Sequence, residues 1–62
     1  MKPLEIRISL LRAGIKTSDI AQLAGVSRQM VWLVINRKAV SAMVMREIAK
    51  ALGKTVDQVF PS

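Results

Sequence analysis

Apolar residues recur every three or four positions along most of the chain, which is the spacing of one face of an α-helix. The first such segment covers residues 3–13, where Pro3 suits the first helical position because it has no N–H group. The main apolar stripe of this segment, which we expect to face the core, consists of Leu4, Ile8, Leu11 and the following Ile15. Ile6 and Leu10 lie off this stripe and are interpreted as a second contact surface. The segment is predicted to be a helix that ends at Gly14.

Two shorter helices are predicted next, separated by a tight turn at residues 24–27. The first covers about residues 18–24 and continues the apolar pattern. Gly25 follows directly, as expected where a helix ends in a left-handed backbone conformation. Ser27 is a candidate N-cap for the second helix, which continues to near Asn36. The two helices and their turn occupy the centre of the sequence.

The last third of the chain predicts two more helices. One begins after Ser41, a good N-cap, and ends at Gly53. Its apolar face consists of Val44, Ile48, Ala49 and Leu52. The other is short and opens with a capping box, in which Thr55 is the cap and Gln58 lies three residues later. The residues of this helix that are expected to reach the core are Val56, Val59 and Phe60.

The length of 62 residues and a hydrophobic fraction of 52% predict one folded all-α domain of five helices, covering residues 1–62. No apolar run approaches the roughly 20 residues that span a bilayer. Glu5 and Arg7 interrupt the apolar residues near the N-terminus, so no signal-peptide core forms. We therefore expect a soluble, cytoplasmic protein without a membrane partner.

The side chains that most enzymes and metal sites use are missing. The chain has no cysteine and no histidine, which rules out disulfides, thiolate sites and the commonest general base. The four acids, Glu5, Asp19, Glu47 and Asp57, fall on different predicted helices without a pairing motif. We expect no catalytic residue, no cofactor, no metal and no small-molecule ligand.

The charge of the chain is strongly positive. Ten Lys and Arg residues against four acids give a net charge of +6 and an isoelectric point near 11.0. For so small a domain this balance favours a polyanionic partner, and nucleic acid more than a membrane surface.

Two helices joined by a turn of about four residues with a central glycine are typical of a helix-turn-helix, whose second helix enters the DNA major groove. Ala21 is small, as a close crossing of the two helices requires. The positions that must be apolar to fix the angle between the helices are Ile20, Ala24, Val26, Val31 and Val34. Because all these requirements are met together, the pattern favours this motif over a generic pair of core helices.

The sequence from Thr17 to Phe60 resembles the lambda repressor, Cro and Xre-type family of bacterial and phage regulators. The matching pieces are DIAQLAGVSRQMV from residue 19, the exit residues Asn36, Arg37 and Lys38, IAKALG from residue 48, and VDQVF from residue 56. The ending Val-Phe-Pro-Ser is also similar to the Ner-like phage regulators, a smaller related group. The resemblance implies a five-helix lambda-repressor-like fold and an operator-binding transcription factor that acts on double-stranded DNA, frequently as a homodimer.

The resemblance places Ser27, Arg28 and Gln29 where the family's recognition helix reads base edges. Their chemistry agrees, because Arg bonds bidentately to guanine and Gln to adenine. It also assigns five residues to the DNA backbone: Thr17 and Ser18 at the start of the first central helix, and Asn36, Arg37 and Lys38 after the second. For Thr17 a plain N-cap is an equally good interpretation.

Trp32 and Leu33 depart from the family, which usually has polar side chains at these positions. Leu33 is assigned to base reading through contact with a thymine methyl group. Trp32 either reaches the sugar-phosphate backbone or folds back onto Arg37 or the fourth helix as extra core, and the second interpretation is favoured. Met30 is a third apolar group nearby, in the groove or in the core.

The alternative function is a protein-interaction module, such as an antirepressor or an oligomerising adaptor, that uses Met30, Trp32 and Leu33 as its contact surface. For the homodimer that the resemblance implies, the exposed apolar surface is expected from Phe60, Met43 or Met45.

Overall fold

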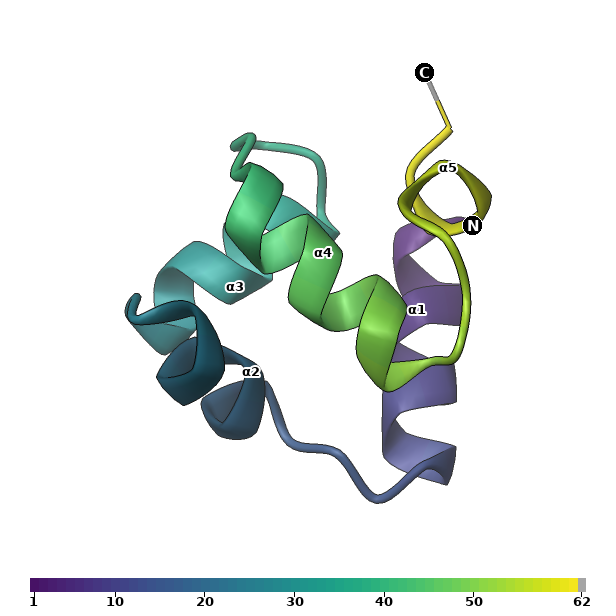
Figure 1. Cartoon of the computed structure of the whole chain (residues 1–62), viewed down its shortest axis with the longest axis horizontal. Coiled ribbons are helices and arrows are strands. Elements are labelled where there is room, and N and C mark those ends of the chain that lie inside the picture. The colour runs from purple at the N-terminus through teal and green to yellow at the C-terminus, as the bar shows by residue number, and fades with distance from the viewer. Residues whose placement is uncertain (62) are drawn as a thin grey trace.

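The computed structural model describes residues 1–61; Ser62, the end of the Val-Phe-Pro-Ser stretch, lies outside the described residues. Over this range the chain forms five α-helices and no strand, as the sequence predicts (Figure 1). The helices are α1 (Pro3–Arg12), α2 (Thr17–Ala24), α3 (Arg28–Ile35), α4 (Ala42–Ala51) and α5 (Val56–Val59). They pack into a body of 25 × 23 × 17 Å. Within the described residues, none of the helices combines the length and the apolar character that a bilayer crossing requires.

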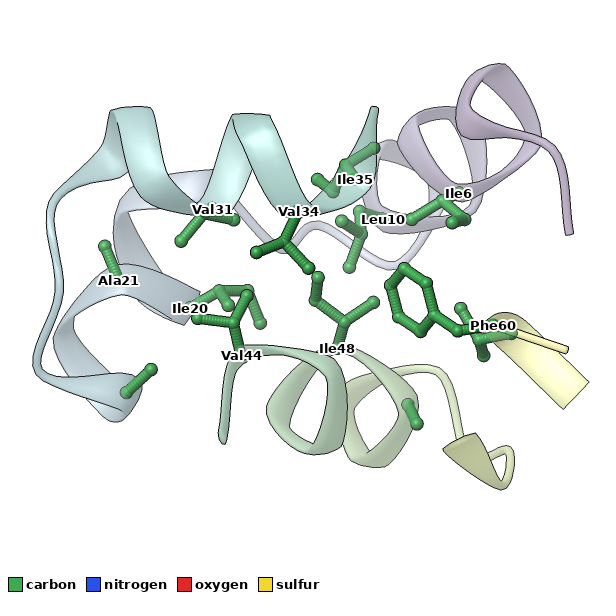
Figure 2. Packing of buried hydrophobic residues seen from close by; sticks show 13 residues of the cluster. Ile6, Leu10, Ile20, Ala21, Val31, Val34, Ile35, Val44, Ile48 and Phe60 are labelled. Carbon is green, nitrogen blue, oxygen red and sulfur yellow. The ribbon is translucent and has the colours of Figure 1, made fainter. Parts of the chain in front are cut away.

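One hydrophobic core lies between α3 and α4 and extends to α1, α2 and α5 (Figure 2). Its largest fully buried side chains are Ile6, Ile20, Ile35, Ile48, Val31, Val34, Val44 and Val59. No polar or charged residue in the described part of the chain is buried with them. The core is therefore held by apolar packing, and the polar groups are left for the surface.

The prediction of which side of α1 faces the core is wrong. Ile6 and Leu10, expected on a second surface, are 0% and 2% exposed and point into the core (Figure 2). Leu4, Ile8 and Leu11, expected in the core, are exposed. The cause is that both sides of α1 are apolar, so local periodicity does not fix its rotation. Contacts with α3 do.

The predicted unit of α2, turn and α3 is confirmed as local structure. Gly25 has φ = 70°, and the Val26 N–H donates to the Ala21 carbonyl oxygen over 3.0 Å, which ends α2. The apolar positions assigned to the helix crossing are buried or packed against the core, namely Ile20, Ala21, Ala24, Val26, Val31 and Val34. The start of α2 differs by one residue, because Thr17 is its first residue and Lys16 is the N-cap.

The caps predicted for the last two helices are present. The Ser41 hydroxyl oxygen accepts a hydrogen bond from the Val44 N–H over 3.3 Å at the start of α4. Thr55 and Gln58 form the reciprocal capping box of α5, with distances of 3.2 and 2.9 Å. The N-terminus lies beside α5 (Figure 1), and the Met1 ammonium donates to the Val59 carbonyl oxygen over 2.9 Å. The first and last helices are thereby joined.

Candidate nucleic-acid interface

Three of the nine residues that the sequence assigns to DNA lie in α3, namely Arg28, Gln29 and Leu33. Val31, Val34 and Ile35 anchor this helix in the core and are at most 2% exposed. Arg28 and Gln29, in the first turn, are both exposed. Because one side of the helix is fixed by packing, the guanidinium and carboxamide groups project from a rigid support.

Ser27 begins the helix and is exposed beside these two side chains. Its hydroxyl oxygen accepts a hydrogen bond from the Met30 N–H over 3.2 Å, so the predicted N-cap is confirmed. The hydroxyl proton is not used in this bond and remains able to donate. The cap thus orders the start of α3 and leaves one polar hydrogen at its surface.

The three apolar residues of α3 separate into different environments. Met30 is half-buried and packs against the core, whereas Leu33 is half-buried on the outer side. Trp32 is 45% exposed, and the Lys38 ammonium lies 5.8 Å from its ring centroid, within range of a cation–π contact. The interpretation of Trp32 as extra core is therefore wrong. The side chain lies at the surface because the core positions of α3 are already filled by Val31, Val34 and Ile35.

The exit loop after α3 is held by its own side chains. The Asn36 carboxamide donates to the Trp32 carbonyl oxygen over 2.9 Å. The Arg37 guanidinium donates to the Met1 carbonyl oxygen over 2.7 Å, although the residue is exposed. Lys38 is exposed above Trp32. Of the three cationic or polar groups assigned to phosphate, Lys38 has the most freedom to meet one.

The start of α2 offers backbone donors. Within residues 1–61 the N–H groups of Thr17 and Ser18 donate to no protein acceptor, as is usual in the first turn of a helix. The side chain of Thr17 does not act as an N-cap, so that interpretation is wrong. Asp19 caps the helix instead, by accepting from the Lys16 N–H over 2.9 Å. The positive end of the helix dipole and two free N–H groups are suited to an anion.

One residue of this site was missed by the sequence reasoning. Lys16 is the exposed N-cap of α2 and adds a positive charge at the start of this helix. Its position was predictable in principle, because Asp19 three residues later is the acid of a capping pattern. The described residues bring together no group of His, Cys, Asp or Glu side chains able to hold a metal ion.

The apolar surface expected for a homodimer is only partly available. Phe60 is 8% exposed and belongs to the core, so its assignment to a dimer contact is wrong. Met45 is half-buried and packs against the core, and Met43 is 53% exposed. Val40, in the loop before α4, is 89% exposed.

Comparisons of the chain with family models, with curated proteins and with solved structures each found no match.

Proposed function

We propose that this protein is a sequence-specific DNA-binding transcriptional regulator with a lambda-repressor-like helix-turn-helix fold, in which α3 enters the major groove. The observation that carries the proposal is the first turn of α3. There Arg28 and Gln29 are exposed, while Val31, Val34 and Ile35 hold the same helix in the core. Arg and Gln are the side chains best suited to read guanine and adenine in the major groove.

The charge and the helix ends support the same proposal. A net charge of +6 attracts the DNA backbone from a distance, and neutralised phosphates release counterions. Thr17 and Ser18 offer their N–H groups to one phosphate, and Lys38 offers its ammonium to another. Backbone contacts of this kind fix the position of a recognition helix, and base contacts then select the sequence.

Selection of binding sites from random duplex DNA tests the proposal directly. We expect a recovered consensus with two related half-sites about 34 Å apart if two copies bind together. Arg28→Ala is expected to relax the preference at one base pair by about 1–3 kcal/mol. Arg46→Ala is the matched control, because Arg46 is an exposed arginine on α4 and its loss changes the net charge equally. Recovery of no consensus, or binding that does not depend on salt, would contradict the proposal.

A protein-interaction module remains the second candidate, and the exposure of Trp32 favours it. An exposed Trp beside a partly exposed Leu33 resembles the aromatic anchors of protein interfaces. If the wild-type chain bound no DNA, and Trp32→Ala abolished self-association or partner binding, this candidate would replace the first. Analytical ultracentrifugation of the wild-type protein and of the Trp32→Ala variant shows whether the substitution abolishes self-association.

A further inference from the structure

The outward side of α1 carries a row of large apolar side chains that no other part of residues 1–61 covers. Leu4, Ile8 and Leu11 are 63%, 40% and 78% exposed, respectively. Their spacing of four and three residues places them on one side of the helix. They border an open groove of about 420 Å³ whose lining also includes Leu10 and Ile15. Contiguous apolar surface of this kind usually marks a binding site.

The edge of this groove is positively charged. Arg7 and Lys16 both line it and are exposed. The nearest acids in the sequence, Glu5 and Asp19, are not among the residues that line the groove. Their carboxylates accept from the backbone N–H groups of Lys2 and Lys16 over 2.7 and 2.9 Å. An occupant of the groove therefore meets apolar side chains at its centre and cations at its rim.

We propose that this groove, which we call the α1 groove, receives a short amphipathic helix of a partner protein that carries acidic residues beside its apolar face. The row from Leu4 to Leu11 extends over eight residues, or seven steps of 1.5 Å, which is about 10 Å. Two turns of a partner helix cover this length and place apolar residues at matching intervals. Glu or Asp residues flanking those positions face Arg7 and Lys16, which sets the orientation of the helix.

A second copy of this chain does not fit the α1 groove. Its four acids lie on four different helices, so no helix within the described residues presents an acidic flank: Glu5, Asp19, Glu47 and Asp57. Each copy also carries a charge of +6, which opposes contact between two basic rims. A DNA backbone is polyanionic and has no contiguous apolar surface to cover the row formed by Leu4, Ile8 and Leu11. The occupant is therefore a different protein, and this inference does not depend on DNA binding.

The experiment uses two labelled synthetic peptides in the absence of DNA. Both are helical and have leucines spaced by four and three residues; one has glutamates at the flanking positions and the other has lysines. We expect the glutamate peptide to bind the full chain in a fluorescence anisotropy titration, and the lysine peptide to bind at least about tenfold more weakly. Arg7→Glu combined with Lys16→Glu is expected to reverse this preference.

Leu11→Gln is expected to abolish binding of the glutamate peptide, since it removes the most exposed side chain of the row. Val40→Gln is the matched control at another exposed apolar position, and it is expected to leave binding unchanged. Circular dichroism checks that both variants remain folded. Equal binding of the two peptides, or binding that survives Leu11→Gln, overturns the proposal. So does Leu11-dependent binding to phosphatidylglycerol vesicles, or Leu11-dependent self-association, in the absence of peptide binding.

Discussion

The guanidinium of Arg37 donates a hydrogen bond of 2.7 Å to the backbone carbonyl oxygen of Met1, which joins the end of α3 to the start of the chain. Arg37 is also the one non-glycine residue with positive φ, 61°, in the described part of the chain. The Arg37 N–H donates to the Val34 carbonyl oxygen, and the Lys38 N–H donates to the Leu33 carbonyl oxygen over 2.8 Å. Helix α3 therefore ends in a Schellman motif. The same motif ends α1, α2 and α4, and there the equivalent residues are Gly14, Gly25 and Gly53.

Substitution of Arg37 separates the backbone strain from the side-chain contact. Arg37→Ala loses the hydrogen bond to Met1, so we expect a loss of about 1–2 kcal/mol in the free energy of unfolding. This variant still has a side chain in the left-handed region, so the backbone strain is unchanged. Arg37→Gly loses the same bond but relieves the strain, and is expected to be about 1 kcal/mol more stable than the alanine variant. Urea denaturation followed by circular dichroism measures both. Equal stability of the two variants would show that the positive φ costs nothing here.

The rotation of α1 is tested by two substitutions of the same kind, two residues apart. Ile6→Val removes a methylene from a fully buried side chain, and we expect a loss of about 0.5–1.5 kcal/mol in the free energy of unfolding. Ile8→Val acts on an exposed side chain and is expected to change it by less than about 0.5 kcal/mol. The melting temperature and the urea midpoint of each variant provide the measurement. A larger effect at Ile8 would restore the face that periodicity alone predicts.

The elements predictable from the sequence are those with local signals. The turn before α3 begins at Gly25 and ends at Ser27. Helix α5 begins with the capping box of Thr55 and Gln58. Each of these residues acts on a backbone group within a few positions, so its effect can be predicted locally. The rotation of α1 had no such signal, since Ile6 and Ile8 are equally apolar. The rotation depends on contacts with α3, which is distant in sequence.

The candidate site was predictable to a similar extent. Arg28 and Gln29 follow a recognisable cap, and the helix period places Gln29 away from the buried Val31, Val34 and Ile35. Arg28 shares the stripe of Val31 and Ile35 and is exposed as the first residue of α3. The placement of Trp32 did not follow, because a large aromatic residue suits either a core or a surface contact. Its environment is decided by Lys38 in the exit loop and by the lack of an open core position.

The surface position of Trp32 has a measurable consequence for stability. Trp32→Ala is expected to lower the free energy of unfolding by about 1 kcal/mol or less, because the ring is exposed and its cation–π contact is weak. Ile35→Ala, in the same helix but fully buried, is expected to cost about 2–5 kcal/mol. Since Trp32 is the only Trp, acrylamide quenching of native fluorescence gives an independent measurement. Strong protection of the native protein from acrylamide would contradict this placement.

If the proposed DNA function is correct, Lys38 and Arg28 affect binding in different ways. Lys38 is expected to contact phosphate, which is present at every base pair. Lys38→Ala should therefore weaken binding to all duplexes by a similar factor, and reduce by about one the slope of log affinity against log salt. Arg28→Ala should instead weaken binding to the selected operator more than binding to a duplex changed at one base pair. Anisotropy titrations with the two duplexes at several salt concentrations separate these effects.

Arg46→Ala on α4 controls for the loss of one positive charge. If Arg46→Ala reduced the salt slope as much as Lys38→Ala, charge alone would account for the attraction of DNA. In that event the loop after α3 would have no privileged contact with the backbone, and the orientation proposed for α3 would fail.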